Sequence, residues 1–202
     1  MAWVIVGLGN PGEKYAGTRH NAGRMAVEHF AKSAKLSEWI EDKKAAALVS
    51  KGLVKRVVVA LVLPNTFMNK SGDAVAKFVK SGKAAERLVV IHDDLDLPLG
   101  TIRIAFNRGS GGHRGIDSIM RKLKTKKFYR IRLGVSPSTA AGVLRKPLGE
   151  IRVMNFILDK WKPHELDELK RIFGRIDQAL ETIATDGPVR AMNKFNSDVR
   201  RS

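Results

Sequence analysis

Short apolar segments alternate with amphipathic helical patterns along most of this 202-residue chain. The apolar segments predict strands at residues 2–8, 45–50, 54–63, 88–92, 101–106 and 128–135, with a hairpin turning at Lys51-Gly52. The helical patterns cover residues 21–35, 71–81, the segment after Gly115 and residues 163–185, and a short basic amphipathic segment and tail occupy 187–202. Residues 37–44 and 136–151 are expected to be loops. Strands alternating with helices, plus one hairpin, predict an α/β fold: a single domain over residues 1–202 with a mixed, twisted sheet flanked by helices.

The charge of the chain favours a polyanionic partner. Lys and Arg number 37 against 20 Asp and Glu, which gives a net charge of +17. Nucleic acid is the first candidate and an anionic membrane surface a distant second, while a generically basic protein remains the alternative. Aromatic residues make up only 6%, so phosphate contacts on a folded nucleic acid suit this composition better than a stacking platform for single strands.

Targeting and redox features are absent from the sequence. No apolar run approaches the roughly 20 residues of a membrane helix, and the amino terminus lacks the basic region of a signal peptide. There is no cysteine, so disulfides and thiolate chemistry are excluded. These observations fit a cytoplasmic protein, and we expect no membrane association.

The first predicted strand runs into a glycine motif that has two interpretations. Gly7, Gly9 and Gly12 spell G-x-G-x-x-G, which is the dinucleotide-binding fingerprint. A dinucleotide site needs a helix that begins within the motif, whereas Pro11 and the polar residues 13–19 delay the helix to about Asn21, which can cap it. The acidic residue expected about 20 positions later is also missing. The glycines therefore indicate a tight turn and close packing.

Unusual polar residues follow the predicted strands that end near residues 8, 63, 92 and 106, which predicts one shared cleft. His20 lies in a polar loop, and Asp93 comes directly after a strand, where its carboxylate can accept a hydrogen bond from the imidazole. The other imidazole nitrogen would then deprotonate water. A metal site made of His92, Asp93, Asp94 and Asp96 is the alternative, but nothing else completes its ligand set, and we expect neither a metal nor a cofactor. No G-x-S-x-G motif or cysteine signals a covalent nucleophile.

Further residues in these loops have open roles. The amides of Asn10 and Asn69 could orient a substrate carbonyl or the water, although Asn10 could be only a turn residue. Phe67 and Met68 could line a small apolar pocket or belong to the core.

Four motifs in this order, VGLGNPGEKYAGTRHNAG, PNTFMNKSG, HDDLDLPLG and GSGGHRG, resemble bacterial-type peptidyl-tRNA hydrolase over nearly the whole chain. The resemblance implies cleavage of the ester between a peptide and the 3′ end of tRNA, without a cofactor. It implies that His20 is the general base, that Asp93 supports it and that Asn10 helps to discriminate N-blocked substrates. Positions that contact the peptidyl-adenosine end would be Tyr15, Phe67 and Asn69.

One position departs from the family pattern. The family commonly has GGHNG where this chain has GGHRG, so Arg114 replaces an asparagine that touches substrate. Arginine cannot accept a hydrogen bond, but it could meet a phosphate or the terminal ribose. We expect that hydrolysis is retained and that binding on this side is altered.

A set of basic residues is expected to bind phosphates of the acceptor arm of peptidyl-tRNA, so that binding weakens at raised salt. They are Arg103, Arg108, Arg114, Arg130 and Arg132, with the cluster Arg121, Lys122, Lys124, Lys126 and Lys127. We expect a monomer with no obligate protein partner. The alternatives are a non-catalytic relative that only binds structured RNA, and a small-molecule enzyme on a similar sheet.

Overall fold

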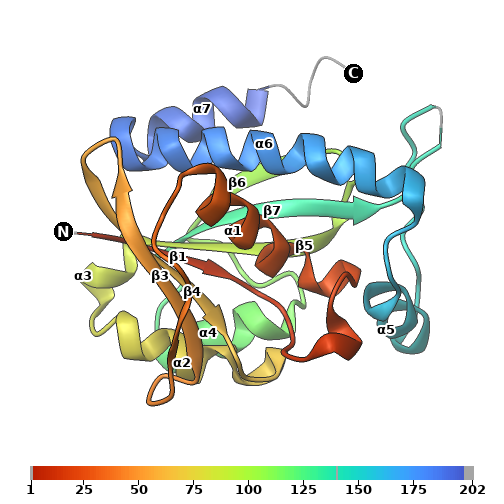
Figure 1. Ribbon diagram of the computed structural model, residues 1–202. Helices are drawn as coiled ribbons and strands as arrows, with labels where there is room; N and C mark the ends of the chain where they lie inside the picture. Colours follow the sequence, from red (N-terminus) through yellow and green to blue (C-terminus); the bar gives the residue numbers. More distant parts are fainter. Residues whose placement is uncertain (1, 140, 198–202) are drawn as a thin grey trace.

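Across residues 2–139 and 141–197, which the computed structural model describes, seven strands form one mixed sheet in the order β2-β3-β4-β1-β5-β7-β6 (Figure 1). The strands are β1 (Trp3–Gly7), β2 (Ile40–Asp42), β3 (Ala47–Val54), β4 (Val57–Pro64), β5 (Leu88–Pro98), β6 (Ile102–Phe106) and β7 (Tyr129–Ser136). The four middle strands β4, β1, β5 and β7 are parallel, and the pairs β2–β3, β3–β4 and β6–β7 are antiparallel. The carboxyl ends of the middle strands therefore meet at one edge of the sheet.

Helices cover both faces of this sheet. They are α1 (Ala22–Ser33), α2 (Ser71–Phe78), α3 (Gly82–Ala85), α4 (Arg114–Leu123), α5 (Glu150–Leu158), α6 (Pro163–Asp186) and α7 (Pro188–Ser197), with the 3-10 turns η1 (Glu13–Tyr15), η2 (Arg19–Asn21) and η3 (Met68–Lys70). One core lies between the sheet and α1, α6 and α7, and the other between the sheet and α2, α3 and α4 (Figure 1). Within β1, Trp3 and Ile5 enter the first core and Val6 enters the second, because successive strand residues point to opposite faces. The predicted α/β fold with a mixed, flanked sheet is confirmed.

The hairpin turns later than predicted. It turns at Lys55 and Arg56, whose φ angles of 49° and 89° suit a two-residue hairpin turn. Gly52 instead lies within β3, where a Cβ atom would come within 2.8 Å of the side chain of Leu36. Glycine at this position serves close packing rather than the turn.

Several predicted loops contain regular structure. Residues 40–42 form the edge strand β2, the acidic segment 93–98 continues β5 past a register shift, and α5 begins at Glu150. Gly82 begins α3 and does not end α2. The longest predicted helix is confirmed as α6, whereas the tail at 198–202 lies outside the described residues. In the part of the chain that the structure describes, no helix is long and apolar enough to cross a membrane.

Strand β6 corrects the expected route into the cleft. Because β6 is antiparallel to β7, Phe106 pairs with Tyr129 at the edge opposite to the carboxyl ends of the middle strands. The glycine-rich residues 107–113 therefore run back to the other edge before α4 begins. This path delivers His113 to the carboxyl end of β5.

Candidate active site

A cavity of about 840 Å³ opens at the carboxyl ends of the parallel strands. Its lining includes seven of the eight predicted site residues: Asn10, Tyr15, His20, Phe67, Asn69, Asp93 and Arg114. Helix α5 and residues 146–149 line it as well. The eighth predicted residue, Arg132, lines a separate hollow.

The glycines bring α1 close to the sheet and so place the His20 loop. A Cβ atom on Gly23 would lie 2.1 Å from the carbonyl oxygen of Ile91, and one on Gly7 would lie 2.6 Å from that of Gly23. The prediction of close packing is thereby confirmed for Gly7, whereas a Cβ atom on Gly12 would meet nothing within 4 Å and the φ of 94° there suits a turn. Asn21 does not cap α1: its side chain accepts from the backbone N–H of Asn10 and donates to the Asn10 carbonyl, both at 2.9 Å. These two bonds join the loop that carries His20 to the one that carries Asn10.

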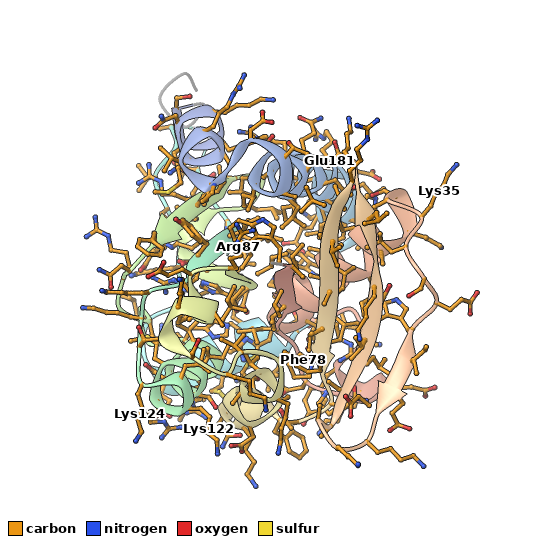
Figure 2. All side chains as sticks on the ribbon, turned by 90° about the vertical axis from the view of Figure 1, so that its left-hand side faces the viewer. Lys35, Phe78, Arg87, Lys122, Lys124 and Glu181 are labelled. Carbon is orange, nitrogen blue, oxygen red and sulfur yellow. The ribbon has the colours of Figure 1, made fainter. Side chains whose placement is uncertain are left out.

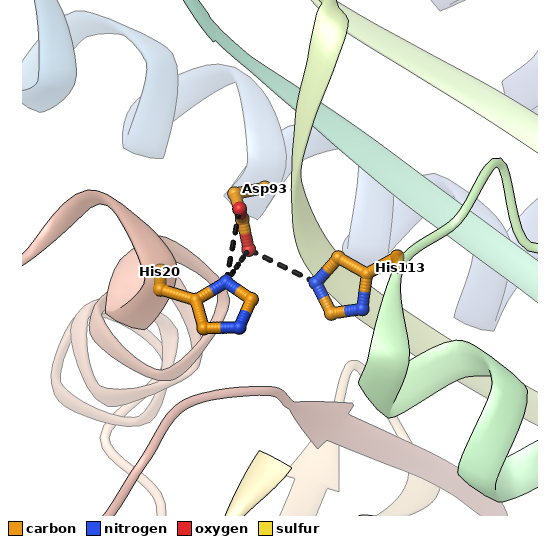
Figure 3. Close-up of side chains that lie close together, drawn as sticks. All are labelled: His20, Asp93 and His113. Carbon is orange, nitrogen blue, oxygen red and sulfur yellow. Dashed lines mark hydrogen bonds and ion pairs between the residues drawn. The ribbon is translucent and has the colours of Figure 1, made fainter. Parts of the chain in front are cut away.

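The predicted contact between His20 and Asp93 is present (Figure 3). His20 Nδ1 lies 3.0 Å from Oδ1 and 3.1 Å from Oδ2 of Asp93, and both residues are buried. Because a carboxylate only accepts hydrogen bonds, Nδ1 carries the hydrogen. Nε2 of His20 makes no hydrogen bond to another described residue, and its lone pair is left for a group in the cavity.

The environment shifts the pKa values of this pair in opposite directions. Burial disfavours the imidazolium form of His20, but the charge and hydrogen bond of Asp93 outweigh burial and raise the pKa of His20, while Arg114 lowers it in part. Burial favours the neutral acid at Asp93, but the facing imidazoles of His20 and His113 hold its pKa well below the ordinary range. Asp93 is therefore a carboxylate at neutral pH and His20 is a strengthened base.

His113 is a third member of the site, which the sequence reasoning missed. Its Nε2 lies 3.0 Å from Asp93 Oδ1, on the other side from His20 (Figure 3). Its Nδ1 accepts from the backbone N–H groups of Gly115 and Ile116, at 3.1 and 3.4 Å, and so caps α4. The signal that could have found it is an imidazole at the end of a glycine-rich loop, just before a helix.

The hydrogen bonds of His113 argue against a metal at this cluster. One ligand atom each from His20, Asp93 and His113 lies within 4.8 Å of the others. Metal binding through His113 Nε2 would move its hydrogen to Nδ1, where it would face the N–H groups of Gly115 and Ile116. As arranged, these three side chains form a hydrogen-bonded set and do not fit an ion.

The members of the alternative metal set are also engaged elsewhere. Asp94 pairs with Arg132 at 2.6 Å and Asp96 with Lys146 at 2.7 Å. His92 Nδ1 bonds the backbone carbonyl of Asp93 at 2.7 Å. Their side chains do not converge on one point.

Asn10 presents a hydrogen-bond donor to the cavity. Its Oδ1 accepts from the backbone N–H of Met68 at 2.8 Å, and its Nδ2 makes no hydrogen bond to another described residue. Met68 is buried in the core, whereas Phe67 is 58% exposed and packs edge-to-face against Tyr15 with ring centroids 6.4 Å apart. Asn69 is exposed beside them. Phe67 therefore faces the cavity opening, and Met68 belongs to both core and lining.

Two arginines hold the ends of α5, which forms a wall of the cavity. Arg114 reaches Glu150 at 2.8 Å, with both side chains largely exposed. Arg19 is buried, donates to Glu165 at 2.7 Å and lies over the ring of Phe156 at 4.5 Å. These arginines directly neighbour His113 and His20 in the chain.

A second hollow of about 830 Å³ lies beside β6, β7 and α7 and is rich in arginine. Arg132, at the edge of this hollow, is neutralised in part by Asp94. Arg130 is only 3% exposed, and no hydrogen bond or ion pair joins it to another residue in the described part of the chain. Arg103 and Arg108 complete the basic lining. The hollow thus contains a buried cation that has no direct ion pair and is balanced only in part by the nearby charge of Asp94.

The predicted lysine cluster lies elsewhere. Figure 2 looks onto the side of the molecule that carries Lys122 and Lys124, at the end of α4. The following strand β7 starts at this edge and ends at the edge that carries Asp93. The cluster is therefore separated from the cavity by the length of the sheet.

Comparison with known proteins gives one consistent family. The sequence profile of the peptidyl-tRNA hydrolase family matches residues 4–202. A peptidyl-tRNA hydrolase of Herpetosiphon aurantiacus is 42% identical over 198 residues, which cover 97% of this chain and 91% of that protein. One of Chloroflexus aggregans is 37% identical over 196 residues, with 96% and 98% covered.

The fold agrees with this assignment. The crystal structure of peptidyl-tRNA hydrolase from Acinetobacter baumannii superposes with a TM-score of 0.84 at 32% identity, and covers 96% of this chain and 94% of that one. Sequence and structure thus match over almost the entire length. The chain belongs to the peptidyl-tRNA hydrolase family.

Proposed function

We propose that this protein hydrolyses the ester bond between the peptide and the 3′ end of tRNA in peptidyl-tRNA, with His20 as general base. The observation that carries the mechanism is the His20–Asp93 contact at 3.0 Å. It fixes the hydrogen on Nδ1 and leaves Nε2 as the acceptor at the cavity.

The reaction needs only these side chains and water. His20 Nε2 takes a proton from water as the water oxygen attacks the ester carbonyl carbon. Asp93 stabilises the imidazolium that forms, and Asn10 Nδ2 donates to the developing oxyanion. Collapse of the tetrahedral intermediate breaks the bond to the ribose oxygen, which takes the proton from His20. The products are the free peptide and tRNA.

The two hollows suit the two halves of the substrate. The lining of the cavity includes Tyr15, Phe67 and Met154, which offer apolar surface to peptide side chains, with Asn69 as a polar contact. The arginine hollow offers Arg130, which has no direct ion pair, together with Arg132 and Arg103 to phosphates of the acceptor arm. Arg114, at the cavity rim, is placed to meet a phosphate or ribose once it leaves Glu150. We propose a monomeric, cytoplasmic enzyme that acts on peptidyl-tRNA released from ribosomes.

The test measures release of an N-acetyl-aminoacyl group from tRNA by the wild type and by His20→Ala. His164→Ala is the matched control, because His164 is exposed and does not line the cavity. We expect turnover by the wild type and the control, and a loss of at least about 10²-fold in His20→Ala. Retained tRNA binding without turnover in the wild type would favour an RNA-binding protein, and full activity of His20→Ala would refute the general base.

A further inference from the structure

We propose that His113 is a positioning residue of the active site, which holds the Asp93 carboxylate and shares its charge with His20. This inference rests on the proposed function. It goes further by assigning a role to His113, which residues 107–113 bring back from the opposite edge of the sheet.

The hydrogen bonds of His113 define its tautomer. Nδ1 accepts two backbone N–H groups at the start of α4, from Gly115 and Ile116, so it carries no hydrogen. Nε2 carries the hydrogen and donates it to Asp93 Oδ1 at 3.0 Å. A hydrogen on Nδ1 would face two donors, so the amino terminus of α4 keeps His113 as a donor to Asp93.

Asp93 consequently accepts N–H groups from two imidazoles. The donor from His113 fixes the rotation of the carboxylate, because it engages the same oxygen that lies 3.0 Å from His20 Nδ1. The same hydrogen bond also stabilises the negative charge of the carboxylate, so Asp93 stabilises the imidazolium form of His20 less than it would alone. His113 therefore keeps His20 basic enough to take a proton and acidic enough to return it.

Other charged or titratable groups around the pair are fixed by the fold. They are Arg114 of α4, whose charge acts on His20, and Glu150 of α5, which pairs with Arg114; His92 and Asp94 flank Asp93 in β5, and Arg130 of β7 acts on His92. The substitution His113→Asn can keep the cap of α4 and with it the position of Arg114, the first residue of that helix. A change in the titration of His20 can then be assigned to the lost or retained donor.

Two substitutions separate the two bonds of His113. In His113→Asn, the amide oxygen can take the place of Nδ1 and cap α4, while the donor to Asp93 is lost. In His113→Gln, the amide nitrogen can take the place of Nε2 and donate to Asp93, while the cap is lost. A structural role alone would make Gln the more damaging change, and a positioning role would make Asn the more damaging change to His20.

The experiment follows histidine side chains by NMR in the protein without substrate, so it does not depend on the proposed reaction. In the wild type we expect the nitrogen shifts of His113 to report a hydrogen on Nε2 and none on Nδ1. In His113→Asn the pKa of His20 should rise by about one unit, and in His113→Gln it should stay near the wild-type value. His164→Asn serves as control.

The pH dependence of hydrolysis then gives a second readout. The acid limb of kcat/KM should move up by about one unit in His113→Asn, which lowers the rate on that limb about tenfold, and His113→Gln should restore it. An unshifted His20 in His113→Asn, or a hydrogen on His113 Nδ1, would overturn the positioning role. If the NMR shifts are as expected but no variant hydrolyses the ester, the inference stands and the proposed function fails.

Discussion

Asp93→Asn tests the geometry of the active site most directly. Because His113 can only donate to Asp93, the amide oxygen must occupy the Oδ1 position in this variant. The amide nitrogen then takes the Oδ2 position, 3.1 Å from His20 Nδ1. There it donates to Nδ1 and favours the tautomer with a hydrogen on Nε2, the nitrogen that accepts the proton of water in the proposed mechanism.

The expected loss can be worked out from these contacts. The hydrogen bond between a carboxylate and the imidazolium contributes about 1.5–3 kcal/mol, and reversing the favoured tautomer costs about one neutral hydrogen bond, about 1 kcal/mol. The total of about 2.5–4 kcal/mol corresponds to a decrease in kcat of about 10²–10³-fold. The pKa of His20 should also fall, because burial then acts without the opposing charge.

The assay is the release of N-acetyl-aminoacyl groups from tRNA as a function of pH, alongside thermal unfolding to show that the variant is folded. Asp73→Asn is the matched control, since Asp73 is exposed and pairs with Lys122 on the surface. A kcat within about threefold of the wild type, or an acid limb that does not move to lower pH, would refute the assigned roles of Asp93 and His113.

Three further predictions concern charge and stability. Arg130→Met should reduce the salt dependence of tRNA binding by about one unit in the slope of log K against log salt. It should not lower the free energy of unfolding, because this buried cation makes no direct ion pair and its burial outweighs the nearby charge of Asp94; an unchanged slope would exclude a phosphate contact. Burial, with smaller contributions from His113 and Arg130, holds the pKa of His92 well below its ordinary value. The neutral His92 therefore stabilises the fold above about pH 6.5, and this stability is lost as the pH falls, at up to about 1.4 kcal/mol per pH unit. The free energy of urea unfolding of His92→Asn should lack this dependence on pH, and the same dependence in wild type and variant would contradict the prediction. Arg19→Met should lower the free energy of unfolding by about 3–5 kcal/mol, because Glu165 is left buried without its cation. The double variant with Glu165→Gln should recover part of this loss. A loss below about 1 kcal/mol in Arg19→Met would show that the pair contributes little.

The sequence predicted those site residues that directly follow one of the parallel strands. Asp93 directly follows the apolar segment 88–92 and His20 follows the first strand, and both strands belong to the parallel centre of the sheet. Parallel strands bring their carboxyl ends to one edge, so the contact between the two side chains follows from local pattern and one topological rule. A histidine and an aspartate at these two positions indicated the proposed acid–base chemistry.

His113 could not be found in this way, because its position depends on how the chain returns. The antiparallel direction of β6 places Phe106 at the opposite edge of the sheet. The sequence of residues 107–112 does not predict that this loop returns to the edge that carries Asp93. The hairpin shows the same limit. Lys51-Gly52 has the better turn composition, yet the packing of Leu36 against Gly52 requires a strand there and moves the turn to Lys55 and Arg56.

The two ends of α5 are stabilised by contacts of different strength, and this difference indicates which end of the helix can move when a peptide enters the cavity. At one end, the buried Arg19 combines a charged pair with Glu165, a contact with Phe156 and a hydrogen bond to the carbonyl of Lys160. At the other end, Arg114 and Glu150 form an exposed pair, and such pairs contribute about 0–1 kcal/mol. Displacing the Arg19 end would disturb the loop that carries His20, whereas separating Arg114 from Glu150 breaks no hydrogen bond of the His20–Asp93–His113 set. The arginine that departs from the family pattern therefore lies at the end of α5 that can yield to substrate, where it can act on binding directly and on the pKa of His20 through its charge.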